Sequence, residues 1–308
     1  MCQHNVELIT FKRSLSASSV WFSEAFLLKR KQGIIMKKHT TTHPEADLRP
    51  GNSEPEEQGR VKVFLQDTGD FALFTGKVMR QSFSIFTEFR EFLRQCYETG
   101  NKSLGLVCIT GIIMGLVLTI QARPILNDFG AESMLPNMVA VSLVREIGPV
   151  ITALICAGKV GSGMGAELGS MRVTEQIDAM EVSAVNPIKY LVVTRVAAIT
   201  FTLPLLVLFA DAMGLLGSWI GMNLKTKINL VLFLSHAFGA LDFMDFFPAL
   251  IKSFFFGTVI GIVGCYKGYS AGKGTASVGI AANSAVVISS LLIIVVDLIA
   301  VQITDLLL

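Results

Sequence analysis

Hydrophobic residues dominate the chain after residue 103 and gather in five long runs separated by short polar segments. A helix that crosses a hydrocarbon core of about 30 Å needs about 20 consecutive apolar residues. The pattern therefore predicts an all-α membrane protein with five transmembrane helices. These cover residues 104–122, 137–158, 190–222, 246–266 and 278–303.

A different pattern precedes the first of these runs. When residues 71–96 are placed at 100° per residue, most apolar side chains, many of them Phe, fall on one side of a helix, although Leu73 and Phe83 break the pattern. Charged residues occupy the other side. A helix of this kind directly before a span is typical of the membrane headgroup layer. We expect an amphipathic interfacial helix in the region 61–103, because the chain offers no large soluble domain for the helix to pack on.

The first 60 residues are polar and carry Pro44, Pro50 and Pro55. Such a composition buries too little apolar surface to fold, so we expect a disordered N-terminal extension over 1–60. No apolar stretch there ends in a small-residue cleavage site, and no signal peptide is expected. The five spans then form one domain over 104–308.

Charge fixes the expected orientation. The whole chain has 308 residues, 52% of them hydrophobic, and 15 of its 26 Lys and Arg lie in residues 1–103. Positive residues favour the cytoplasmic side of a membrane. With the N-terminus inside and the C-terminus outside, six basic residues fall in inner loops and three in outer loops. The inner ones are Lys159, Arg172, Lys189, Arg195, Lys267 and Lys273; the outer ones are Arg123, Lys225 and Lys227.

Cofactor chemistry finds no support in the chain. The five Cys and four His are dispersed without metal-ligand spacing, and we expect neither a metal site nor a disulfide, with the cysteines acting as small apolar residues. Residues 268–275 resemble a P-loop, but only three residues separate Gly268 from Gly272, and Gly274 rather than Ser or Thr follows Lys273. We therefore expect no catalytic residue and no ATP hydrolysis in this chain.

Glycines recur at intervals of four residues within the apolar runs. Such spacing lets helix backbones approach closely in lipid, so it predicts tight helix packing and carries no information about a substrate. The sets are Gly111/Gly115, Gly161/Gly165/Gly169, Gly217/Gly221, Gly257/Gly261 and Gly264/Gly268/Gly272.

The segment between the second and third runs is charged and compatible with a helix over 167–181. Val173, Ile177 and Met180 form an apolar stripe at helical spacing. The pattern predicts a short cytoplasmic helix, which either seats in a groove of a partner protein or is a solvated connector. Both interpretations stay open on pattern alone.

Besides Arg195 near the start of the third run, five charges lie within apolar runs, where each costs about 2.5–3.5 kcal/mol and normally faces protein, water or ligand. Arg145 and Glu146 are neighbours that diverge by about 100° on a helix, so neither simply neutralises the other. They either meet a ligand or join a structural polar network. For the other three we expect structural roles: Asp211 at the end of a tilted span, Lys252 snorkelling to the surface, and Asp297 paired across helices.

Longer strings in this region carry a resemblance. They are Arg145-Glu146-Ile147-Gly148-Pro149-Val150, the stretches 157–162 and 166–180, Asn186-Pro187, and the later run 265–269. With these strings the chain resembles the MlaE family of lipid ABC transporter permeases over about residues 60–308. Lys159 stands where the family often has Arg, and Gly163-Met164-Gly165 is richer in glycine than the family pattern.

The resemblance implies a homodimer of five-span subunits in a bacterial inner membrane, with a periplasmic C-terminus. A separate ABC ATPase, which uses ATP and magnesium, would receive the 167–181 coupling helix through Glu167, Arg172, Glu175 and Asp178. The dimer would enclose a cavity for phospholipid that opens toward an MCE-domain protein, with a small STAS-domain protein as a further partner and no nucleic acid. Arg145 would meet the lipid phosphate, and Glu146 would either organise Arg145 or bind a facing helix.

Two other functions remain to be weighed against this one. An ion-coupled secondary transporter would use Glu146, Asp211 or Asp297 as its proton or sodium site. A non-transporting scaffold for envelope assembly would need no site at all.

Overall fold

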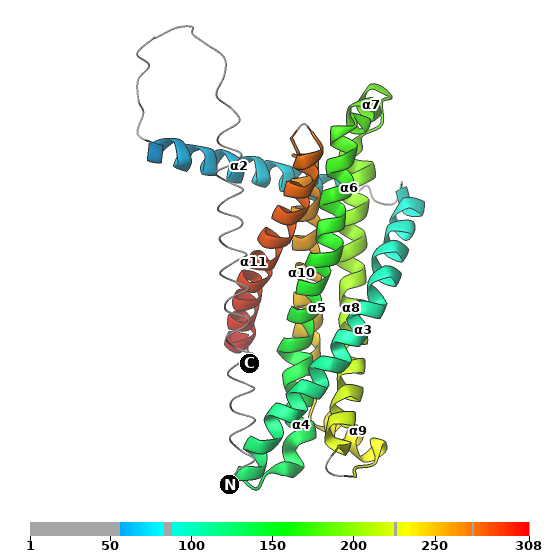
Figure 1. Cartoon of the computed structure of the whole chain (residues 1–308), viewed down its shortest axis with the longest axis vertical. Coiled ribbons are helices and arrows are strands. Elements are labelled where there is room, and N and C mark those ends of the chain that lie inside the picture. The colour runs from blue at the N-terminus through cyan, green and yellow to red at the C-terminus, as the bar shows by residue number, and fades with distance from the viewer. Residues whose placement is uncertain (1–55, 83–87, 225–226, 273, 308) are drawn as a thin grey trace, which may run out of the picture. The chain divides into compact units, whose positions relative to one another are not determined.

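The protein is described here from a computed structural model, which covers residues 56–82, 88–224, 227–272 and 274–307 (Figure 1). Every regular element in these ranges is helical, which confirms the predicted all-α class. The chain divides into two units, residues 1–60 and 61–308, and the helical fold belongs to the second. The expected disordered extension lies almost entirely outside the described residues.

Five helical stretches are long and apolar enough to cross a membrane, as predicted. Each contains one of the predicted runs and extends beyond it at both ends, by one to fifteen residues, because a helix does not end where hydrocarbon gives way to headgroups. The five stretches are Phe89–Asp128, Glu132–Val173, Ile188–Asn223, Asp245–Tyr269 and Thr275–Leu306.

The second and third spans are composite. The second joins four α- and 3-10 elements through two π-helical turns, and the third begins with a π-helical stretch. A π turn adds one residue to the ladder of hydrogen bonds and often marks a functional site. The elements are η2 (Glu132–Met134), α4 (Leu135–Ser142), η3 (Leu143–Ile147, π), α5 (Gly148–Cys156), η4 (Ala157–Gly161, π), α6 (Ser162–Val173), η5 (Ile188–Val193, π) and α8 (Thr194–Asn223).

α8 is the central helix of the bundle. It packs against α3 (Phe89–Asp128), α10 (Phe243–Tyr269) and α5, and most of its length is buried. α11 (Thr275–Leu307) packs on α10 and α6, and the short α9 (Leu230–Gly239) packs on α4. α3 and α11 keep rows of exposed apolar side chains, a surface suited to lipid or to another subunit.

Glycines set the distance between the helices, as their spacing predicted. A Cβ added at Gly115 on α3 would overlap the carbonyl oxygen of Gly214 on α8, and one at Gly217 would overlap the carbonyl of Ile112. On α10, Gly257 faces the backbone of α8, and a Cβ added there would lie 2.8 Å from the carbonyl oxygen of Ile199. Only hydrogen fits at these crossings, so the backbones themselves are in contact.

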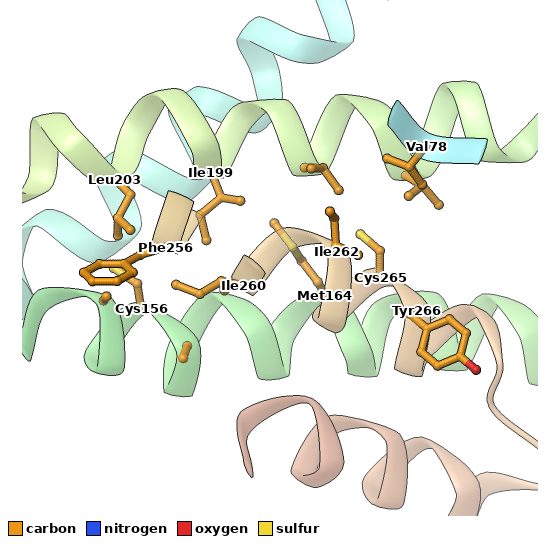
Figure 2. Packing of buried hydrophobic residues seen from close by; sticks show 14 of the residues in the cluster. Val78, Cys156, Met164, Ile199, Leu203, Phe256, Ile260, Ile262, Cys265 and Tyr266 are labelled. Carbon is orange, nitrogen blue, oxygen red and sulfur yellow. The ribbon is translucent and has the colours of Figure 1, made fainter. Parts of the chain in front are cut away.

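The main apolar core lies where α5, α6, α8 and α10 meet (Figure 2). Phe256 of α10 and Leu203 of α8 fill one end of it, and Met164 of α6 lies farther along. Cys156 and Cys265 are fully buried in this cluster as free thiols, so these two behave as the small apolar residues expected.

Within the described residues, which leave out 83–87, the amphipathic stretch 71–96 is divided between two helices. Its first part belongs to α2 (Glu56–Ser82), and its last part opens α3, which continues without a break into the first span. Phe71 and Phe74 of α2 pack on Tyr266 at the end of α10, with ring centroids 5.2 and 5.4 Å apart. Part of the apolar face is therefore covered by the protein's own helices, while Leu73 and Met79 stay exposed. An interfacial position for α2 stays a prediction.

Candidate functional site

Three charged residues from three helices form a connected group in the interior. The ammonium of Lys252 on α10 donates to Glu146 Oε2 of η3 at 2.6 Å and to Asp297 Oδ1 of α11 at 3.1 Å. Only 6% of the Lys252 side chain is exposed. The expectation that Lys252 snorkels is wrong, because two carboxylates within reach offset the cost of burying its charge. The expected pairing of Asp297 across helices is confirmed.

Arg145 lies next to this group and faces a different partner. Its guanidinium is 3.7 Å from Asp245 Oδ1 in the first turn of α10, and 40% of its side chain is exposed. Arg145 and Glu146 do diverge, as their adjacency on a helix predicted, and each finds a partner on α10. The π turn η3 presents both of them.

Asp245, which the sequence did not mark as a functional residue, is held in place at the start of α10. It completes a capping box in which the Asp242 side chain accepts from the backbone N–H of Asp245, while the Asp242 N–H donates to Asp245 Oδ2 at 3.2 Å. Acidic residues are favoured at a helix N-terminus by its exposed N–H groups. The D-x-x-D spacing before an apolar run is a local signal that could have found this fixed carboxylate.

An apolar cavity of about 410 Å³ lies between η3, α8, α9 and the start of α10, and η3 contributes Val144, the residue before Arg145, to its wall. Most of its walls are aliphatic or aromatic, and two carboxylates interrupt them. The lining residues are Val144, Leu208, Asp211, Ala212, Leu215, Phe238, Leu241, Asp242 and Phe246. A cavity of this composition suits an apolar chain with a few polar atoms.

Asp211 is the buried acid of that cavity. It lies in the middle of α8 and not at the end of a span, which corrects the sequence-based expectation. It is 6% exposed, and its Oδ1 has no hydrogen-bond partner among the described residues. Gly148 makes room for it, because a Cβ there would overlap that oxygen. This oxygen therefore packs against the second span at Gly148 and is not exposed to solvent.

The predicted coupling segment forms a corner instead of one helix. α6 ends at Val173 and α7 (Gln176–Val182) begins after a turn in which Glu175 adopts a left-handed φ of 58°. Ile177 is fully buried and Met180 packs on the main core, so the apolar stripe faces the protein's own interior. The expectation of one uninterrupted helix over 167–181 is wrong, because anchoring the stripe requires the chain to turn.

The four proposed coupling residues do not lie in one cluster. Arg172 and Asp178 pair with each other across the corner, and Glu175 is exposed at its tip. Glu167 lies farther down α6, where its Oε1 accepts from Arg195 at 2.7 Å. Arg195 is 3% exposed and belongs to α8, so it is not the loop residue that the count of charges assumed.

Comparison with known proteins places these features in a family. A family profile described as "Permease MlaE" matches residues 92–303, which include both the Arg145 group and the α6–α7 corner. A probable ABC transporter permease protein of Rickettsia typhi is 39% identical over 232 residues, 75% of this chain and 90% of that protein.

More distant relatives match over similar lengths. A probable ABC transporter permease protein of Synechocystis is 37% identical over 206 residues, 67% of this chain and 78% of that protein. The chloroplastic protein trigalactosyldiacylglycerol 1 of Arabidopsis thaliana is 33% identical over 225 residues, 73% of this chain and 64% of that protein. With its five spans and these matches, the chain belongs to the MlaE family of ABC transporter permeases.

Proposed function

We propose that this protein is the membrane subunit of an ABC transporter that moves phospholipid or a related lipid, driven by ATP hydrolysis on a separate subunit. The observation that carries the proposal is the half-exposed Arg145 in η3, the same turn that contributes Val144 to the wall of an apolar cavity of about 410 Å³. A cation next to an apolar cavity matches an amphiphile with an anionic head and acyl chains. The name of the chloroplast relative, which contains a galactolipid, supports a lipid substrate class.

Arg145 is the residue we assign to the lipid phosphate. Its contact with Asp245 is long at 3.7 Å and involves one nitrogen, so most of the guanidinium's donors remain for a ligand. Arg binds phosphate oxygens in a bidentate manner. Glu146 is already held by Lys252, and in this proposal it fixes the position of η3 and does not touch the lipid.

The α6–α7 corner is the surface we assign to the ATPase. Glu175 and Asp178 are exposed there, and the buried Ile177 anchors the corner to the bundle. A rigidly anchored corner can transmit a push from a partner into α6 and, through the same span, into η3. ATP and magnesium would be bound by that partner.

The remaining parts of the assembly follow from the family resemblance. A homodimer would cover part of the exposed apolar surface of α3 and α11. We place the N-terminus in the cytoplasm and the C-terminus in the periplasm of a bacterial inner membrane. An MCE-domain protein would then receive lipid at the end of the bundle that carries α4 and α9, and a small STAS-domain protein is a further partner on the ATPase side.

Reconstitution tests this function directly. The chain, co-purified with its ATPase and with an MCE-domain protein, is placed in liposomes that contain a fluorescent phospholipid. We expect lipid transfer that requires ATP and stops when the ATPase is catalytically inactive. Transport by the chain alone, driven by a proton or sodium gradient, would contradict the proposal in favour of secondary transport. A complex that neither holds nor moves lipid would favour a scaffold.

A further inference from the structure

A second, polar pocket lies between α3, the η4–α6 part of the second span, and α8. It has a volume of about 130 Å³. Lys159, one of its lining residues, is 14 positions after Arg145 in the same span, which corresponds to about 20 Å along a helix at 1.5 Å per residue. The pocket is therefore separate from the Arg145 group and from the apolar cavity.

Two residues that line this pocket each have one buried polar atom without a hydrogen-bond partner among the described residues. Arg195 donates to the Leu191 carbonyl at 2.9 Å and to Glu167 at 2.7 Å, but its Nε has no hydrogen-bond partner among the described residues. Ser103 is 1% exposed, and its Oγ also lacks a partner within the described ranges. Leaving a buried donor unsatisfied is costly, so both donors indicate a bound acceptor.

The balance of charge in the pocket favours an anion. Lys102, Lys159 and Arg195 face Glu98 and Glu167. The ammonium of Lys159 donates to the backbone carbonyl of Lys102, and among the residues described it forms no ion pair with a carboxylate. Its charge is thus held at the pocket by a neutral group. One positive charge in excess and two free donors match the oxygens of a phosphate.

The depth of the pocket in the bundle favours a lipid as the source of that phosphate. The first apolar run begins at residue 104 and the second ends at 158, so Lys102 and Lys159 lie where hydrocarbon gives way to headgroups. Basic pockets between transmembrane helices at this level bind anionic headgroups. We propose that this pocket binds the phosphate of an anionic lipid in the leaflet beside α7. The proposal does not depend on what the protein transports.

The test is lipid binding by the delipidated full-length protein, measured by native mass spectrometry with phosphatidylglycerol as the probe. We expect Lys159→Ala to weaken binding about fivefold, the effect of one basic residue near an anionic lipid. Ser103→Ala should weaken it as well, whereas Lys159→Arg should retain it. Lys189→Ala, which removes the same charge at the same end of the bundle outside the pocket, is the matched control and should bind as wild type.

Further measurements distinguish a lipid phosphate from free phosphate, and this pocket from the Arg145 site. Phosphatidylcholine should bind more weakly than phosphatidylglycerol, and inorganic phosphate should compete only at much higher concentration. Arg145→Ala should keep the Lys159-dependent binding, so failure of the transport proposal would leave this result intact. Equal binding by wild type and Lys159→Ala overturns the site. Phosphate that binds as tightly as the lipid overturns the headgroup assignment and leaves a site for a free anion.

Discussion

Lys252 of α10 lies 2.6 Å from Glu146, 106 positions earlier in the chain, and holds η3 against the middle of the bundle. Since Asp297 of α11 approaches the same ammonium at 3.1 Å, one lysine joins three of the five spans. Glu146 and Asp297 are partly exposed while Lys252 is not. Removing the buried ammonium of Lys252 would therefore leave two carboxylates without their counter-charge.

Lys252→Met should lower the free energy of unfolding by about 2–3 kcal/mol, at the low end of the cost of breaking a buried ion pair because both carboxylates are partly exposed. Thermal unfolding of the purified protein in detergent measures this. Adding Glu146→Gln and Asp297→Asn to Lys252→Met should restore part of the lost stability, because no unbalanced charge remains. A triple variant less stable than Lys252→Met would contradict the electrostatic origin.

Gly115→Ala should destabilise the bundle, because its Cβ would overlap the Gly214 carbonyl and force α3 away from α8. We expect a loss of about 1–3 kcal/mol, the usual cost of overpacking. Gly105→Ala is the matched control on the same helix, since a Cβ there meets nothing within 4 Å. Gly105→Ala should be neutral or raise stability by up to about 1 kcal/mol through helix propensity. Equal effects of the two variants would exclude close packing as the cause.

Arg145→Ala should abolish ATP-dependent lipid transfer while the complex with the ATPase still assembles. Among the described residues Asp245, at 3.7 Å, is the one ion-pair partner of Arg145, so loss of Arg145 removes a ligand contact without breaking the Lys252 group. Arg145→Lys should keep partial transfer, because it retains the charge but loses the bidentate geometry. The measurement is fluorescent phospholipid transfer in liposomes alongside gel filtration of the complex. Normal transfer by Arg145→Ala would refute the assigned role.

Glu175→Asn together with Asp178→Asn should lose ATPase association in a pull-down. Asn tolerates the left-handed φ at position 175, so this pair of changes removes two charges and keeps the turn. The matched control is Asp305→Asn, an exposed acid near the end of α11, which should associate normally. If the double variant still binds the ATPase, the α6–α7 corner does not carry the contact.

Hydropathy predicted the five spans well, because crossing a hydrocarbon layer demands a minimum apolar length that any sequence must display. It also identified Arg145 and Glu146 as unusual, since charges inside such runs are costly. The sequence did not reveal which residues pair with Arg145 and Glu146. Asp245, at the edge of the fourth apolar run, was given no role, and Lys252 was expected to reach the surface, because neither residue carries a local sign of what lies across the bundle.

The coupling segment shows the same limit. Its charges and its Val173, Ile177 and Met180 stripe are visible in the sequence, and both favour an amphipathic helix. Whether that stripe faces a partner or the chain's own core depends on residues far away along the chain. The structure buries Ile177 in the main cluster, and the turn at Glu175 follows from that packing.

The amino-acid order alone thus determined the class of protein, the number of spans and the glycine-lined helix crossings, because these depend on local composition and spacing. Tertiary structure decided which charges are partners: Lys252 pairs with both Glu146 and Asp297, and Arg195 pairs with Glu167. The physical reason is that an ion pair in a bundle joins whichever side chains the helix crossings bring to one depth. Those crossings are set by backbone contacts between helices that lie far apart in the chain.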